Sequence, residues 1–174
     1  MANIPDIRLL LTRTNYYSKW KSVTRIILMK VKKNKSREWS NQLLKRGIEF
    51  HGHSGPFLVV GLRMGLAALK QLDAKGWFDL RCRVFLNWRP PDSCVVDGIQ
   101  TTTGCTMGKR NIEIEEGDGI EAKFTKEGSR LKIVLKQRML DRLRAAQTDD
   151  EAETLIAELR DTPDECLFDL SFSN

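Results

Sequence analysis

The sequence lacks several features that mark common classes of protein. Its 174 residues include only four cysteines and two histidines, and aromatic residues make up 7%. No apolar run approaches the ~20 residues of a transmembrane helix, because Arg63 interrupts the longest candidate, Pro56–Leu69. There is no Cys-x-x-Cys pair, and the first residues have no continuous apolar segment followed by a small-residue cleavage site. We therefore expect a cytoplasmic protein with reduced thiols and no membrane partner.

Motifs of several enzyme families are also missing. The loop containing Gly104 and Gly108 fails the P-loop pattern, since only three residues separate the glycines and Arg110 stands where serine or threonine is needed. The sequence has no nucleophile elbow and no dinucleotide fingerprint. Binding of an anion by Lys109 and the neighbouring backbone amides remains open.

Positive charge is concentrated at the N-terminal end. Residues 1–37 contain ten Lys or Arg and one acid, Asp6, a net charge of +9. The whole chain is +6, so the remainder is −3. A nucleic-acid-binding domain is expected to carry its positive charge on a folded face, and we therefore expect no nucleic-acid partner. Residues 1–37 are interpreted as a basic extension, either disordered or upstream of a true start at Met29.

The rest of the sequence has the pattern of one α+β domain, residues 38–174, with an antiparallel sheet packed with helices. Hydrophobic residues make up 41% and charged residues 30%, as in ordinary soluble domains. Strands are predicted at 80–86, 111–116, 120–125 and 130–136, the last three as an antiparallel meander. Helices are predicted at 38–47, 56–72, 94–102, 137–146 and from Thr148 to Pro163. Gly61 and Gly65 permit close approach of another backbone, either within the domain or in a homodimer.

Two segments combine glycines with side chains able to bind a metal. In the predicted irregular loop around His51-Gly52-His53, residues two apart point to the same side if the backbone is extended, so the imidazoles can converge. Imidazole and thiolate suit zinc. A pair of solvated or capping histidines is the alternative. Cys94 and Cys105 are each either ligands or small buried residues, and Asp97 lies on the helix face of Cys94.

These two segments together resemble a known family. Phe50-His51-Gly52-His53, and Asp97-Gly98-Ile99-Gln100 leading into Thr103-Gly104-Cys105-Thr106-Met107-Gly108-Lys109-Arg110-Asn111, look like the family of the E subunit of formylmethanofuran dehydrogenase. The resemblance implies an α+β core, usually dimeric, with a divalent metal, zinc above all, in a pocket made by both motifs. The implied metal ligands are His51, His53, Cys94 and Cys105. The implied ligand-binding residues are Asp97, Gln100, Thr106 and Lys109.

Two departures from the family pattern shape the functional expectation. The cysteine that precedes the family proline is Gly55 here, and the Cys-rich zinc ribbon of many relatives is missing from the end of the sequence. We therefore expect weak metal binding, which falls as pH drops through the ordinary histidine range near ~6.5. Two functions stay open. One is a metal- and small-molecule-binding protein of one-carbon or molybdoenzyme metabolism, alone or with a molybdenum or tungsten dehydrogenase. The other is a non-catalytic accessory module.

Overall fold

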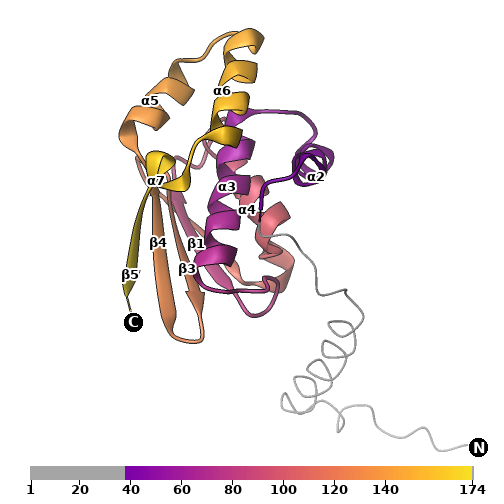
Figure 1. Cartoon of the computed structure of the whole chain (residues 1–174). Coiled ribbons are helices and arrows are strands. Elements are labelled where there is room, and N and C mark those ends of the chain that lie inside the picture. Colours follow the sequence, from indigo (N-terminus) through magenta and orange to yellow (C-terminus); the bar gives the residue numbers. More distant parts are fainter. Residues whose placement is uncertain (1–37, 174) are drawn as a thin grey trace, which may run out of the picture. The chain divides into compact units, whose positions relative to one another are not determined.

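The computed structural model describes residues 38–173, which form a single α+β domain as predicted. A five-stranded sheet has the order β2-β1-β3-β4-β5, with β2 at one edge and β5 at the other (Figure 1). The strands are β1 (Arg81–Leu86), β2 (Ile112–Glu116), β3 (Glu121–Lys126), β4 (Ser129–Leu135) and β5 (Phe168–Ser173). The helices are α2 (Asn41–His51), α3 (Pro56–Gln71), α4 (Cys94–Thr103), α5 (Gln137–Ala145), α6 (Asp149–Asp161) and α7 (Asp164–Leu167), with a 3-10 turn η2 at Met107–Lys109.

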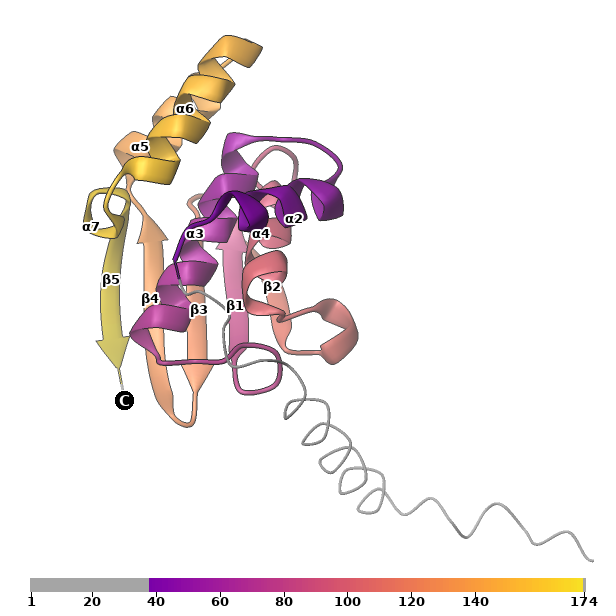
Figure 2. The same ribbon diagram turned by 45° about the vertical axis from the view of Figure 1, so that its right-hand side comes forward.

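The predicted meander of three strands is wrong in its first member. β2 pairs in parallel with β1, and β1 lies between β2 and β3 (Figure 2). The segment from β1 to β2 contains α4 and η2, which is long enough for the crossover that a parallel pair requires. Only β3 and β4 form the expected hairpin. The prediction also missed β5, although Phe168, Leu170 and Phe172 alternate along it and it pairs antiparallel with β4.

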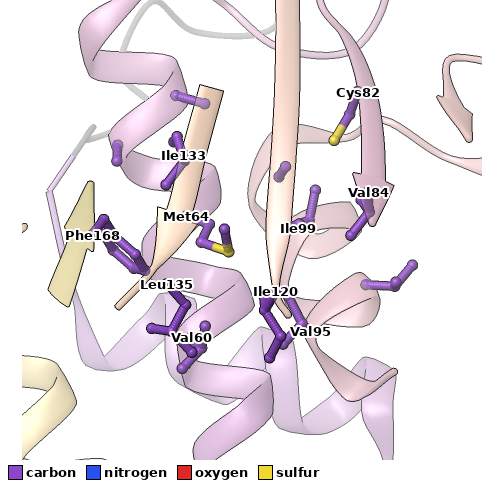
Figure 3. Packing of buried hydrophobic residues seen from close by; sticks show 14 of the residues in the cluster. Val60, Met64, Cys82, Val84, Val95, Ile99, Ile120, Ile133, Leu135 and Phe168 are labelled. Atoms are coloured by element: carbon purple, nitrogen blue, oxygen red, sulfur yellow. The ribbon is translucent and has the colours of Figure 1, made fainter. Parts of the chain in front are cut away.

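The core lies between one face of the sheet and α3 and α4 (Figure 3). α3 is buried along most of its length, which explains why its sequence is apolar on all sides rather than on one stripe. β1 alternates between buried and exposed positions, as a strand with one covered face should. Cys82 and Val84 from β1 meet Val60 and Met64 from α3 in this core.

Glycines set the distance between α3 and α4. A Cβ atom at Gly61 would lie 2.0 Å from the backbone oxygen of Val95, and one at Gly98 would lie 2.3 Å from that of Leu58. Gly65 faces Thr102 in the same way, with 2.6 Å to the Thr102 Cβ. The glycine face of α3 is therefore used inside the domain. Of the two roles predicted for Gly61 and Gly65, the internal one is observed.

Arg63, which interrupts the apolar run of α3, anchors the end of α6. Its guanidinium donates to the backbone oxygens of Leu159, Arg160 and Thr162 and to the carboxylate of Asp164. These oxygens include carbonyls that the last turn of a helix leaves without intrahelical partners. The side chain is buried, and its charge is compensated by Asp164 at 2.6 Å. No helix within residues 38–173 is long and apolar enough to cross a membrane.

The predicted capping box at the start of α6 is present and offers a test of local stability. Thr148 accepts from the Glu151 backbone N–H, and Glu151 accepts from the backbone N–H groups of Gln147 and Thr148, which lowers the pKa of Glu151. We expect Thr148→Ala to lower the free energy of unfolding by about 1 kcal/mol near neutral pH. The contribution of the Glu151 carboxylate should be lost as pH falls through its lowered pKa.

Urea unfolding at about pH 7 and about pH 3 measures both effects. Thr154→Ala is the matched control, because Thr154 lies inside α6, where alanine has the higher helix propensity. A loss of stability for Thr154→Ala as large as that for Thr148→Ala would contradict the capping role.

Candidate functional site

The first histidine lies at the end of a helix rather than in a loop. α2 continues through Gly47, the predicted stop, and ends at His51, where Gly52 adopts a left-handed conformation with φ 101°. Gly47 is instead a packing residue, since a Cβ there would lie 3.1 Å from Leu62 Cδ1. The prediction of an irregular segment from Ile48 onward is therefore wrong. The left-handed residue reverses the chain and brings the rings of His51 and His53 together, with centroids 4.4 Å apart and a 57° tilt.

His51 is fixed by a carboxylate. Its Nδ1 lies 2.7 Å from Oδ2 of Asp97, in the first turn of α4. An ionised carboxylate only accepts hydrogen bonds, so Nδ1 carries the proton and Nε2 presents its lone pair. Nε2 is buried and has no hydrogen-bond partner among the described residues. The His51 side chain is only 9% exposed, so this nitrogen is an acceptor held ready in a mostly dry place.

The second histidine is held in the same tautomer by different means. His53 Nδ1 lies 2.9 Å from the backbone oxygen of Ser54, which can only accept, so Nδ1 donates. The free lone pair is again on Nε2. His53 is exposed, whereas His51 is mostly buried. Two adjacent imidazoles thus present the same nitrogen, and each is oriented by an oxygen on the other side of its ring, the arrangement typical of metal-binding histidines.

Asp97 is itself positioned by its own helix. Gln100 Nε2 donates to Asp97 Oδ1 over 3.4 Å, while Oδ2 accepts from His51. Both Asp97 and Gln100 were predicted as ligand-binding residues from the resemblance. The structure brings them to His51 through the first turns of α4, which α2 contacts directly.

Cys94 begins α4, one helical turn before Asp97. Its thiol is half-buried, and its pKa is raised, first by burial and then by the negative charge of Asp97. The thiol is therefore protonated at neutral pH. A metal ion that binds the sulfur must displace this proton, so any contribution of Cys94 to binding increases with pH.

Cys105 lies elsewhere. α4 has 10 residues, about 15 Å of helix, and Cys94 and Cys105 stand at its opposite ends. Cys105 is fully buried, its Sγ donates to the Leu80 backbone oxygen over 3.4 Å, and burial raises the pKa of its thiol. The structure thus places Cys105 in the core, while His51 and Asp97 meet near the other end of the helix.

Thr106 and Lys109 satisfy one another in the turn η2. The Thr106 hydroxyl accepts from the Lys109 backbone N–H at 3.3 Å and from Lys109 Nζ at 3.1 Å. Asn111 ties this loop to the fold: it accepts from Thr106 N–H at 2.9 Å and donates to the backbone oxygens of Leu80 and Trp77. Asn111 was not among the predicted site residues. Its position directly before a strand was the available signal.

Gly55 stands directly beside the histidine pair. It is the N-cap of α3 with φ −168°, an extended conformation that any residue adopts. A Cβ at this position would lie 3.6 Å from His53 Cε1 and 3.7 Å from His53 Nδ1. Within residues 38–173, no three His, Cys, Asp or Glu side chains are grouped so as to hold a metal ion. The site therefore provides two imidazole lone pairs, next to a position where the side chain is missing.

Comparison with known proteins gives one family. The model of the family described as FmdE, molybdenum formylmethanofuran dehydrogenase operon, matches residues 50–169. A protein of Archaeoglobus fulgidus described as a "Probable S-adenosyl-L-methionine-binding protein" is 36% identical over 77 residues, which is 41% of this chain and 20% of that protein. The chain thus spans about a fifth of the length of this relative.

A solved structure has the same fold. It is the crystal structure of an FmdE-like protein from Syntrophus aciditrophicus, described by its likeness to a tungsten formylmethanofuran dehydrogenase. The TM-score is 0.57 and the sequence identity is 17%. The match covers 76% of this chain and 70% of that one. At this identity the likeness concerns the fold alone.

Proposed function

The chain belongs to the FmdE family, whose model matches residues 50–169, and on that premise we propose that it binds a divalent metal ion together with a small molecule. His51 and His53 are the proposed metal ligands. Asp97 and Gln100 orient His51, and Cys94 is a further candidate ligand on the same helix. Zinc is the ion that this donor set suits best.

One observation supports this proposal above the others. Nε2 of His51 is buried without a hydrogen-bond partner among the described residues, while Nδ1 is bonded to Asp97 at 2.7 Å. Burying an unpaired polar atom costs free energy, so such an atom in a native site needs an explanation. A metal ion at Nε2 removes the cost, and the carboxylate on the far side of the ring is the partner that metal-binding histidines usually have.

The small molecule follows from the small number of protein donors. Two imidazoles leave most of the coordination positions of a zinc-like ion to other donors, and an open position is the property that separates catalytic from structural zinc sites. When bound, such an ion supplies Lewis-acid chemistry. The chain's own residues do the rest: Asp97 keeps the proton on Nδ1 of His51, and the Ser54 carbonyl keeps it on Nδ1 of His53.

A second candidate function is a non-catalytic binding module that has lost full metal ligation. Gly55 favours it, because the position beside His53 has no side chain where the family pattern has cysteine. The absence of a three-donor group among residues 38–173 points the same way. The two functions differ in whether the histidine pair binds a metal ion measurably.

We expect purified, untagged protein to bind Zn²⁺ or Co²⁺ through its two histidines. Because these are the only histidines of the chain, imidazole NMR signals report on this site alone. His51→Gln should abolish the metal-induced shifts. Asp97→Asn, which leaves His51 in place but weakens its orientation, should reduce affinity by about 10–100-fold. Calorimetric titration measures the affinities.

Exposed Cys166 provides the control for adventitious binding by thiols. Cys166→Ser should bind the metal as the natural protein does, whereas Cys94→Ser should weaken binding if that sulfur is a ligand. Equal affinity of His51→Gln and the natural protein would contradict the metal-binding proposal and favour the accessory module.

The wider context is part of the same proposal. Family membership supports a role in one-carbon metabolism as a cytoplasmic homodimer, alone or with a molybdenum or tungsten dehydrogenase. Because Gly61 and Gly98 are used between α3 and α4, a dimer must use another surface. The description of the Archaeoglobus relative makes S-adenosyl-L-methionine one small molecule to test in the presence of the metal.

A further inference from the structure

The face of the sheet opposite the α3–α4 layer has an unusual pattern of charge. The exposed positions of β1, β3 and β4 on this face form a row in which Arg83 pairs with Lys123 and Lys123 pairs with Lys132. The row ends in Glu113 on β2 and Ser171 on β5. Like charges directly opposite each other in a sheet are destabilising. Three consecutive cations across adjacent strands therefore carry a cost that the fold itself does not require.

A second row beside the first contains no carboxylate. Arg81 pairs with Thr125, Thr125 with Arg130, and Arg130 with Ser173. Two guanidinium groups thus flank a threonine hydroxyl, and a serine hydroxyl closes the row. Arg81 donates to a backbone oxygen, that of Arg110, at 3.3 Å.

The carboxylates near these cations lie on the other side of the first row. Glu113 and Glu115 both pair with Arg83, at 2.8 and 3.1 Å. Glu121 is shared between Lys123 at 3.0 Å and Lys132 at 3.8 Å. One carboxylate cannot neutralise two ammonium groups, so positive charge remains between the two rows, toward Arg81 and Arg130.

The two rows border a real depression. A pocket of about 530 Å³ is lined by both of them, with Arg81, Arg83, Lys123, Arg130, Lys132 and Thr125 among its residues. This volume falls in the range of ordinary small-molecule sites, about 300–1,000 Å³. The pocket was not predicted because the charge summed over the whole domain is −3, whereas the strand register gathers the cations on one face.

We propose that this pocket binds a small phosphate-bearing molecule with at least two negative charges. Guanidinium groups match phosphate oxygens in a bidentate manner, and hydroxyl groups such as that of Thr125 donate to the same oxygens. The charge of such a ligand offsets the repulsion in the Arg83–Lys123–Lys132 row. The site belongs to the sheet face opposite α3 and α4, so it is separate from the histidine pair and does not rest on the metal-binding proposal.

The test uses inorganic pyrophosphate as the probe, titrated into the full chain at constant ionic strength. We expect saturable binding with a stoichiometry of one, and acetate at the same ionic strength should not compete. Arg130→Gln should weaken binding by roughly tenfold or more, the size of effect expected for losing a charge-assisted hydrogen bond. Arg46→Gln is the matched control, because Arg46 is an exposed arginine on α2.

A second variant separates binding from folding. Lys132→Gln relieves the repulsion with Lys123, so it should leave the free energy of unfolding unchanged or higher while it weakens pyrophosphate binding. The proposal is overturned if pyrophosphate does not bind, or if Arg46→Gln and Arg130→Gln weaken it equally, which would mean diffuse attraction to surface charge. It is also overturned if a short single-stranded oligonucleotide occupies the pocket at far lower concentration than pyrophosphate, since the site would then serve nucleic acid.

Discussion

Gly61→Ala is expected to destabilise the domain by at least ~3 kcal/mol, the upper part of the range for overpacked cores. The new Cβ would lie 2.0 Å from the Val95 backbone oxygen and 2.8 Å from the Val95 carbonyl carbon. These are backbone atoms of α4, so no side-chain rotation relieves the overlap. α3 and α4 would have to separate, and both are part of the main core. Helix propensity alone predicts the opposite sign, since alanine favours a helix over glycine by about 1 kcal/mol.

Urea unfolding followed by circular dichroism measures the change. Gly108→Ala is the matched control, because a Cβ added there would have no heavy atom within 4 Å and its φ lies outside the left-handed region. That control should be neutral or slightly stabilising. Equal stability of Gly61→Ala and Gly108→Ala would mean that α3 and α4 do not cross as closely as described.

Elements with a local signal were the ones that could be predicted well from the sequence. The alternation in β1, β3 and β4 and the capping box before α6 were placed within a residue or two of their observed positions. The pairing of β2 with β1 depends on where α4 carries the chain, so no window of sequence contains it. Glycine often ends helices, which is why a stop was predicted at Gly47, but here the glycine makes room for Leu62.

The candidate site shows the same division. That His51 and His53 lie together, and that Asp97 and Gln100 are beside them, follows from motifs that the sequence displays. The reason differs from the expected one, because a left-handed Gly52 after a helix replaces the extended loop. The placement of Cys105 was not predictable from its motif, since a buried thiol and a ligand thiol look alike in a sequence. Only the length of α4 separates it from Cys94.

Gly55→Cys is expected to convert weak metal binding into strong binding. The substitution restores the cysteine that the family pattern places before the proline. A Cβ at Gly55 lies in ordinary contact with the His53 ring, at 3.6 Å from Cε1, and the φ of −168° needs no strain. The added sulfur is therefore within reach of an ion held by His51 and His53. We expect zinc affinity to rise on the order of 10–100-fold or more, since even an orienting partner outside the ligand shell changes affinity by that factor.

Co²⁺ separates an organised metal site from a merely reactive thiol, because thiolate ligation to Co²⁺ gives an intense charge-transfer absorption. Gly119→Cys adds the same group at a turn where no heavy atom lies within 4 Å, so it reproduces the chemistry without the two imidazoles. Only Gly55→Cys should show the absorption, and His51→Gln combined with it should reduce the absorption. If Gly55→Cys and Gly119→Cys behave alike, the histidine pair does not organise a metal site. The loss of the cysteine would then be one part of a wider loss of ligation, as the accessory-module function requires.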